Sequence, residues 1–577
     1  MKAVSIRHVA VWRIRLITCV ILFAVLVIFG RLYYLQIVKN DYYLARAEGQ
    51  YVSSVRNVYT RGSIFFTTRD GEKVSAATVR SGYLLVIDPS RLNMDPEKVY
   101  EKINEIIPLD RERFLSNVSD SERRYYEAAS RLIPESADQI VALGINGVQL
   151  YRDQWRFYPA DSLASRIVGF VGYGGDEDDR LVGRYGLERY YEDVLTRNQN
   201  QLAVNLFAEL FSDLGNKSED VDMNRPGEII TSIEPTVTRM LEKNLYEVHE
   251  EWDSSLTGGI IINPNNGQIY AMSAVPNFNL NDRRGKTIAD FRNPLVEDVY
   301  EMGSIIKAIT IAAGLDSGAI TADSTYYDSG SLTMDRFTIR NFDGRGRGTV
   351  DMQEVLSQSL NTGVSHIVAK MGKDTFRNYM FSLKLGNETG IDLPNEVHGL
   401  VSNLNSPRDI EYATASFGQG VAFTPIDTVR ALSALANGGR LITPHLVTSI
   451  EYENGTVRQT RFPEGDRVFS EETSEEISRM LTRVVDEALR QGKVKLDNYS
   501  VGAKTGTAQI AHPQGGYYDD RFLHTFFGYF PSYDPQFLIL LYTKEPKNVR
   551  YASETLTDAF MSMTKFLINY YNIPPDR

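Results

Sequence analysis

The sequence has 577 residues, of which 42% are apolar and 24% are charged, a balance that excludes a disordered chain and at this length predicts two or three domains. Lys and Arg number 62 against 74 Asp and Glu, so the net charge of −12 lacks the basic excess that a nucleic-acid-binding protein needs. A single cysteine excludes an internal disulfide and a cysteine-based zinc cluster.

The N-terminal segment is typical of a membrane anchor. Residues 1–15 carry four basic side chains and no acidic one, and an apolar run follows that resumes after Arg31. Residues 16–38 are long enough to cross roughly 30 Å of hydrocarbon. A cleaved signal peptide is the alternative, but its small-x-small site at 45–47 lies far beyond the apolar run. We therefore predict a cytoplasmic tail at 1–15, a transmembrane helix at 16–38 and the rest of the chain outside the cell membrane.

Residues 39–225 mix short strands with charged helices and contain no catalytic constellation. The apolar run 83–87 predicts a buried strand. Asp95 as N-cap and Pro96 at the first helical position predict a helix that follows it. These features favour a non-catalytic spacer or docking domain.

The pattern changes to a glycine-punctuated one after residue 225. The predicted elements are a strand at 228–233, an amphipathic helix at 235–251, a hairpin of strands 258–262 and 268–272 around an Asn-Asn-Gly turn, and an apolar strand at 537–542. Strands at both ends with helices between them predict an α+β domain at 226–577, whose sheet joins distant parts of the sequence.

The first chemical motif is Ser304 and Lys307, at the start of a predicted helix. Residues three apart share a helical face, so the two side chains are expected to lie together. A serine attacks a carbonyl only when a base removes its proton, and a buried lysine can be that base once its amine is neutral. Taken alone, the pattern is equally consistent with a helix N-terminus that carries an exposed lysine.

Two further motifs follow. Ser359-Leu360-Asn361 places a hydroxyl and an amide on one short turn, where they could pass a proton and hold a carbonyl, although Asn361 could equally be a turn residue. Lys504-Thr505-Gly506-Thr507 continues a predicted strand from Val501. Its lysine and threonine suit a carboxylate, and its glycine lets a ligand approach the strand edge; an ordinary exposed edge strand is the alternative.

In this order the three motifs resemble the penicillin-recognising serine acyltransferases, whose signature is S-x-x-K, S-x-N and K-T-G. Further segments narrow the resemblance to monofunctional class B penicillin-binding proteins. These are Arg31–Gln36 at the end of the anchor, Arg61-Gly62-Ser63-Ile64, Arg156-Phe157-Tyr158-Pro159 and Gly186-Leu187-Glu188 in the pedestal, and Phe417-Gly418-Gln419-Gly420, Thr424-Pro425 and Ala436-Asn437-Gly438-Gly439 in the transpeptidase domain.

The resemblance implies a role for each motif residue. Ser304 would take the acyl group from a D-Ala-D-Ala stem peptide, and Lys307 would be its base. Ser359 would relay a proton to the leaving group, and Asn361 would bind the peptide. Lys504 would set the electrostatic potential of the site. Thr505 would bind the substrate carboxylate, Gly506 would keep the strand edge accessible, and the backbone N–H groups of Ser304 and Thr507 would form an oxyanion hole.

The same resemblance implies the fold, localisation and partners. We expect a single membrane helix, an α+β pedestal at 39–225 of the non-catalytic dimerisation type, and a β-lactamase-like transpeptidase domain at 226–577 with an antiparallel sheet flanked by helices. The enzyme would cross-link peptidoglycan outside the cell membrane, bind β-lactams, need no cofactor or metal, and receive glycan strands from a SEDS-family glycosyltransferase among divisome membrane proteins. Residues 516–546 and the overall length are more similar to division-type than elongation-type enzymes.

Departures from the family pattern are small. Met302 stands where proline is common, which should affect helix entry rather than chemistry, and residues 65–71 lack the usual early aspartate of the pedestal. Leu360 replaces the aspartate of class A β-lactamases, and no deacylating glutamate is evident, so hydrolysis should be slow. A carboxypeptidase or β-lactamase-like hydrolase, a β-lactam sensor and a non-catalytic divisome scaffold remain the alternatives.

Overall fold

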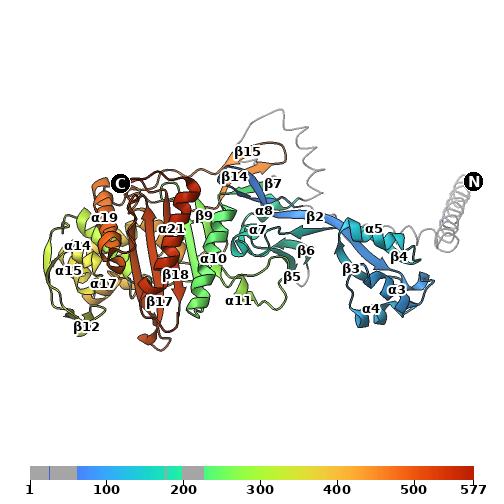
Figure 1. The fold of residues 1–577 in the computed structure, drawn as a ribbon, viewed down its shortest axis with the longest axis horizontal. Coiled ribbons are helices and arrows are strands. Elements are labelled where there is room, and N and C mark those ends of the chain that lie inside the picture. Colours follow the sequence, from blue (N-terminus) through green and yellow to red (C-terminus); the bar gives the residue numbers. More distant parts are fainter. Residues whose placement is uncertain (1–21, 23–24, 26–60, 176–177, 198–225) are drawn as a thin grey trace, which may run out of the picture. The chain divides into compact units, whose positions relative to one another are not determined.

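The computed structural model describes residues 61–175, 178–197 and 226–577, together with Leu22 and Val25 (Figure 1). The predicted tail and the predicted transmembrane helix at 16–38 therefore lie outside the described residues, apart from those two positions. Within the described part, no helix is both long enough and apolar enough to cross a membrane. The described chain divides into two compact units, one formed by residues 80–155 and the other by residues 61–79 and 156–577.

The smaller unit packs three helices against a short sheet. Its elements are the second half of β2 (Lys73–Ile87), η2 (Pro89–Arg91), α3 (Pro96–Asn104), α4 (Arg111–Val118), β3 (Tyr126–Leu132), α5 (Pro134–Ala142) and most of β4 (Val148–Phe157). The predicted strand at 83–87 is confirmed as the buried end of β2. The predicted cap is confirmed too, because the Asp95 carboxylate accepts the Glu97 N–H at 2.9 Å.

The larger unit contains the first half of β2 in a mixed sheet, in the order β15 (Val457–Gln459), β14 (Val447–Tyr452), β7 (Gly227–Thr231), β1 (Ile64–Thr67), β2. β7 runs parallel to β1 and antiparallel to β14. The strand predicted at 228–233 is β7, which ends at Thr231 because the next backbone N–H, that of Ser232, bonds to Leu446 outside the ladder. The predicted helix is confirmed as α10 (Pro235–Glu251), whose start is fixed by Pro235 at its first position.

A second, wholly antiparallel sheet forms the centre of the same unit, in the order β16 (Gly502–Ala511), β17 (Tyr517–Phe530), β18 (Phe537–Lys544), β8 (Leu256–Ile262), β9 (Ile269–Val275). It confirms the predicted hairpin as β8–β9 and the predicted late strand as β18, and Ile261 lies opposite Ile539. Distant segments therefore share one sheet, and β16, which carries the third motif, is at its edge.

Side chains of this sheet alternate between two cores because successive residues of a strand face opposite ways. Ile261 packs with Leu241 of α10 and Phe560 of α21 (Thr557–Tyr571). Ile260 and Ile262 pack on the other face, with Ile309 of α13 (Ile306–Asp316). Figure 1 places α10 and α21 together beside the sheet. The helix with Lys307 is thus held against the face opposite to α10.

The remaining described elements complete the larger unit. They are α6 (Ser165–Val168), β5 (Val171–Gly175), β6 (Asp178–Gly183), α7 (Gly186–Tyr190), α8 (Glu192–Leu195), α11 (Ile288–Phe291), α12 (Pro294–Glu297), η4 (Gly303–Ile305), β10 (Thr325–Asp328), β11 (Ser331–Met334), β12 (Phe337–Arg340), β13 (Gly348–Asp351), α14 (Met352–Ser357), α15 (Asn361–Met371), α16 (Lys373–Ser382), η5 (Ser402–Asn405), α17 (Asp409–Ala415), α18 (Pro425–Ser433), α19 (Glu471–Arg483), the turns η6 (Val484–Ala488) and η7 (Leu489–Gly492), and α20 (Ala552–Thr555).

Candidate active site

Ser304 lies in the short 3₁₀ helix η4, directly before α13. Gly303 has a φ of +63°, a conformation that glycine adopts without strain, and this turn leads the chain into the helix. Ser304 is half-buried, whereas most of α13 is fully buried, so the serine is at the accessible end of a rigid support. Met302 has a φ of −74°, close to the value that proline imposes, so the sequence departure leaves the helix entry unchanged.

Lys307 is fully buried on the first turn of α13. Its amine donates to the backbone carbonyl of Ser359 at 2.5 Å and to the Ser359 hydroxyl at 3.1 Å. Burial lowers the pKa of Lys307 well below 10.5, and the positive charge of Lys504 lowers that pKa further. This lowered pKa favours the neutral amine, which the chemistry of a general base requires.

The second motif forms the turn between α14 and α15. Ser359 has a φ of +57°, and the fully buried Leu360 anchors the turn behind it. Asn361 begins α15, and its amide donates to the carbonyl of Arg340 at 2.8 Å. The turn thus points the Ser359 hydroxyl at Lys307 and holds the Asn361 amide against β12.

The third motif lies on β16, next to the serine. Lys504 is buried, its amine donates to the Thr505 carbonyl at 2.9 Å, and burial lowers its pKa to about 7. Thr505 is half-buried on the edge strand. The Thr507 hydroxyl accepts the backbone N–H of Ala552 at 3.1 Å, which fixes that end of β16 against α20.

The structure brings the three motifs together. A Cβ added to Gly303 would meet the Thr507 carbonyl at 3.1 Å, so η4 and β16 are in direct contact. Lys307 joins this pair to the second motif through Ser359. The site therefore combines the half-buried hydroxyl of Ser304, the buried amine of Lys307, a second hydroxyl and a second lysine. These are the groups that acyl transfer through a serine requires.

Gly506 is the position where the contact is tightest. A Cβ there would lie 2.3 Å from the Thr525 hydroxyl, 2.9 Å from the Met302 carbonyl and 3.0 Å from the Ile305 nitrogen.

Gly506→Ala is expected to push β16 away from η4 and lower the rate of serine acylation about 100-fold, because a shift near 1 Å is enough for that loss. The rate of acylation by a labelled penicillin measures the effect, and Ser317→Ala, at the exposed far end of α13, is the control. An unchanged Gly506→Ala rate would contradict the close packing.

The pedestal motifs noted in the sequence also meet, in a buried ion cluster. The fully buried carboxylate of Glu188 accepts from Arg61 Nε at 2.6 Å and from Arg156 Nε at 2.6 Å. Arg156 also donates to the carbonyl of Gly62 at 2.8 Å. Arg61, Arg156 and Glu188 each come from a different motif, and the charges of the cluster balance when Glu192, which accepts from Arg61 at 2.7 Å, is included.

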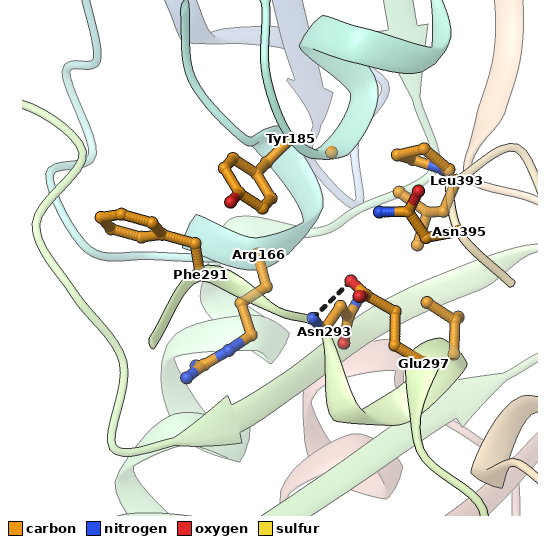
Figure 2. Close-up of a pocket in the computed structure, with 10 residues that line it drawn as sticks. Arg166, Tyr185, Phe291, Asn293, Glu297, Leu393 and Asn395 are labelled. Carbon is orange, nitrogen blue, oxygen red and sulfur yellow. Dashed lines mark hydrogen bonds between the residues drawn. The ribbon is translucent and has the colours of Figure 1, made fainter. Parts of the chain in front are cut away.

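A small pocket lies elsewhere in the larger unit, beside α7 and α12 (Figure 2). It is lined by Arg166, Tyr185, Gly186, Phe291, Asn293, Val296, Glu297, Leu393, Pro394 and Asn395. The Asn293 backbone N–H donates to the Glu297 carboxylate at 2.8 Å across its floor. None of the three motifs contributes to its lining, so the acyl-transfer site is separate from it.

Sequence patterns could not identify every residue that supports the serine. Gly418 accepts the Gly303 N–H at 3.2 Å, and Glu301 contacts the same loop through Gly420. The loop was visible in the sequence only as a family motif, and Glu301 had no signal beyond its position three residues before Ser304. Contacts between residues more than 100 positions apart depend on tertiary packing, which spacing does not reveal.

Comparisons with known proteins identify two regions of the chain. Residues 257–563 match the penicillin binding protein transpeptidase domain, and residues 57–217 match the penicillin-binding protein dimerisation domain. Stage V sporulation protein D of Bacillus subtilis is 29% identical over 92% of this chain and 81% of its own length. The peptidoglycan D,D-transpeptidase FtsI homolog of Mesostigma viride is 26% identical over 95% of this chain and 94% of its own.

A solved structure shows the same fold. Penicillin binding protein 2X from Streptococcus thermophilus superposes with a TM-score of 0.72, over 90% of this chain and 81% of that one, at 20% identity.

Proposed function

The chain belongs to the penicillin-binding protein transpeptidase family, and we propose that it is a class B peptidoglycan D,D-transpeptidase with Ser304 as its nucleophile. The observation that carries the assignment of roles is the position of Lys307. Its buried amine lies one helical turn from Ser304, contacts Ser359 and is affected by the charge of Lys504. The three motifs therefore supply one reaction centre.

Acylation follows from these contacts. The Ser304 hydroxyl attacks the carbonyl carbon between the two D-Ala residues, and the neutral Lys307 amine takes its proton. The oxyanion that forms accepts hydrogen bonds from the backbone N–H groups of Ser304 and Thr507. When the peptide bond breaks, Ser359 passes a proton from Lys307 to the departing D-Ala nitrogen. Lys504 and Thr505 hold the terminal carboxylate, Gly506 gives the peptide access to the strand edge, and Asn361 binds the peptide.

Deacylation forms the cross-link. The amine of a neighbouring stem peptide attacks the acyl-enzyme carbonyl and loses a proton to Lys307. The Ser304 oxygen is displaced and takes that proton back, which restores the serine hydroxyl and the neutral lysine. A β-lactam acylates the same serine. Leu360 stands where class A β-lactamases carry an aspartate, and the sequence offers no evident equivalent of their deacylating glutamate, so transfer to an amine is favoured over hydrolysis.

The cellular role and topology are parts of the same proposal. We assign the enzyme to septal wall synthesis, supported by residues 516–546, with elongation as the alternative. We also propose one anchor at 16–38, a cytoplasmic N-terminus, a pedestal at 39–225 and a catalytic domain at 226–577 outside the membrane. A SEDS-family glycosyltransferase and divisome membrane proteins would bind the anchor and pedestal.

The test is covalent labelling by penicillin. The purified full-length chain is expected to form a stable one-to-one adduct, detected by intact mass and mapped to Ser304, and Ser304→Ala should abolish it. Ser317→Ala, an exposed serine at the opposite end of α13, is the matched control and should be labelled normally. Loss of the wild-type adduct within seconds would indicate a hydrolase. A stable adduct at a serine other than Ser304 would contradict the proposal.

Transfer itself needs a second measurement. With lipid-linked glycan polymer and a glycan polymerase supplied, the wild-type enzyme should produce cross-linked dimers of stem peptides. Production of trimmed tetrapeptides alone would identify a carboxypeptidase. Complementation of a deletion strain by Ser304→Ala would identify a scaffold instead.

A further inference from the structure

Glu301 connects three chain segments around the nucleophile. It lies three residues before Ser304 and is half-buried. A single carboxylate oxygen, Oε1, accepts the Gly420 backbone N–H at 3.1 Å and the Tyr517 hydroxyl at 3.1 Å. Glu301 therefore joins its own segment to the 418–420 loop and to the hairpin formed by β16 and β17.

The first of these contacts fixes the backbone beside the serine. On one side of Glu301, Tyr300 exchanges two backbone hydrogen bonds with Phe423, both at 2.9 Å. On the other side, the Gly303 N–H donates to the Gly418 carbonyl at 3.2 Å, and a Cβ on Gly418 would lie 2.3 Å from the Gly303 oxygen. The Glu301 side chain closes this two-segment contact at Gly420, so the loop cannot move without moving Gly303.

The second contact fixes the strand that faces the serine. Tyr517 begins β17, whose partner β16 carries Lys504 and Thr507. The ladder between these strands shifts register between Gln509 and Ala511, so regular pairing is interrupted just before the Ala511–Tyr517 pair. The Tyr517 hydroxyl supplies an additional link, because it connects this end of the hairpin to the residue three positions before the nucleophile.

The second carboxylate oxygen of Glu301 is buried, and burial affects the pKa of this side chain. Glu301 Oε2 is buried and has no hydrogen-bond partner among the residues that the structure describes. Burial of the carboxyl group raises the pKa of Glu301 to about 7, although the two hydrogen bonds to Oε1 act in the opposite direction. Oε1 accepts both hydrogen bonds whether or not the carboxyl is protonated, and an amide oxygen can accept the same two.

We infer that Glu301 is a positioning residue, which holds the 418–420 loop and the β16–β17 hairpin so that the Ser304 hydroxyl and the Thr507 N–H face one carbonyl. It acts through Gly420 and Tyr517 and does not itself exchange a proton with substrate. This inference rests on the proposed function, because it takes Ser304 as the nucleophile.

The experiment separates binding from acylation. With the full-length chain and a labelled penicillin, Glu301→Ala is expected to lower the acylation rate constant at saturation about 10- to 100-fold, while the non-covalent dissociation constant changes less than about twofold, since displaced reacting groups slow chemistry more than binding. Glu301→Gln retains the acceptor and should stay within about threefold of wild type, and Tyr517→Phe, which removes one of two donors, should lose roughly three- to tenfold.

The matched control is Glu396→Ala. Glu396 also ties a loop, through the backbone N–H groups of Thr389 at 2.7 Å and Gly390 at 3.1 Å, but it contacts no motif residue. Its loss should leave the acylation rate constant unchanged. If Glu301→Ala does not fold, Tyr517→Phe and Glu301→Gln still decide the question.

Two results would overturn the inference while leaving the proposed function intact. One is wild-type acylation by Glu301→Ala. The other is an equal loss in Glu301→Gln and Glu301→Ala, because the charge and not the accepted hydrogen bonds would then matter. Absence of an adduct in the wild-type chain would instead overturn the proposed function itself, and with it this inference.

Discussion

Replacing Lys307 by methionine is expected to reduce the acylation of Ser304 about 10²- to 10⁴-fold, the usual contribution of a positioned general base. Methionine has a similar length and no charge, so it suits the fully buried position without leaving a cavity. The folded state should therefore persist while the base is removed. The rate of adduct formation with labelled penicillin measures the loss, and Lys370→Met, an exposed lysine on α15, is the control.

The pH dependence gives an independent check on the same residue. Lys307 has a lowered pKa, so the second-order acylation rate should fall as pH drops through that pKa and the amine gains a proton. Lys504 has a pKa of about 7, so its charge, which attracts the substrate carboxylate, is lost as pH rises above that value. We expect a bell-shaped profile, and in Lys307→Met the acid limb should be absent. An acid limb that persists in that variant would assign the base to another group.

Replacing Glu188 by alanine is expected to destabilise the folded chain by about 3–5 kcal/mol, because it leaves two buried guanidinium groups without their common carboxylate. Arg61 and Arg156 both bond to Glu188 at 2.6 Å, and the carboxylate is fully buried. The loss should appear as a lower midpoint of denaturant unfolding, followed by far-ultraviolet circular dichroism.

Two variants distinguish charge from packing at this cluster. Glu188→Gln preserves the shape and removes the charge, so it should lose most of the same stability. Glu471→Ala, which breaks the exposed ion pair with Arg467, should leave the midpoint unchanged. If Glu188→Gln unfolds at the wild-type midpoint, the cluster is held by hydrogen bonding alone and charge balance is unimportant.

Local signals in the sequence predicted a large part of the fold. The amphipathic pattern of residues 235–251 predicted α10, Asp95 and Pro96 placed the start of α3, and the Asn-Asn-Gly turn gave the β8–β9 hairpin. These features succeed because caps and tight turns depend on neighbouring residues. β2 is different: only its apolar end, 83–87, was predicted. Residues 73–82 are mostly polar or small, and the first of them, 73–77, pair with β1.

The residues of the candidate site could be predicted from the sequence, but the contacts between them could not. The three motifs named Ser304, Lys307 and Lys504, but nothing local indicated that Lys307 would bond to Ser359 or that Gly303 would pack against Thr507. The ion cluster at Glu188 is similar, since its three motifs are separate in the sequence. Such contacts depend on how whole elements pack, and a one-dimensional pattern contains only the residues that allow them.

The strand order of the central sheet also constrains biogenesis. β8 and β9 are synthesised before α13. The other neighbour of β8 is β18, and the strand that faces Ser304 is β16; both are synthesised after α13. At ordinary rates of synthesis, residues 502–544 follow on the order of tens of seconds after β8 has emerged. During that interval one edge of β8 lacks its partner strand and can pair with another chain. The nucleophile stays inert until those strands arrive, so an antibiotic should acylate finished molecules and spare nascent ones.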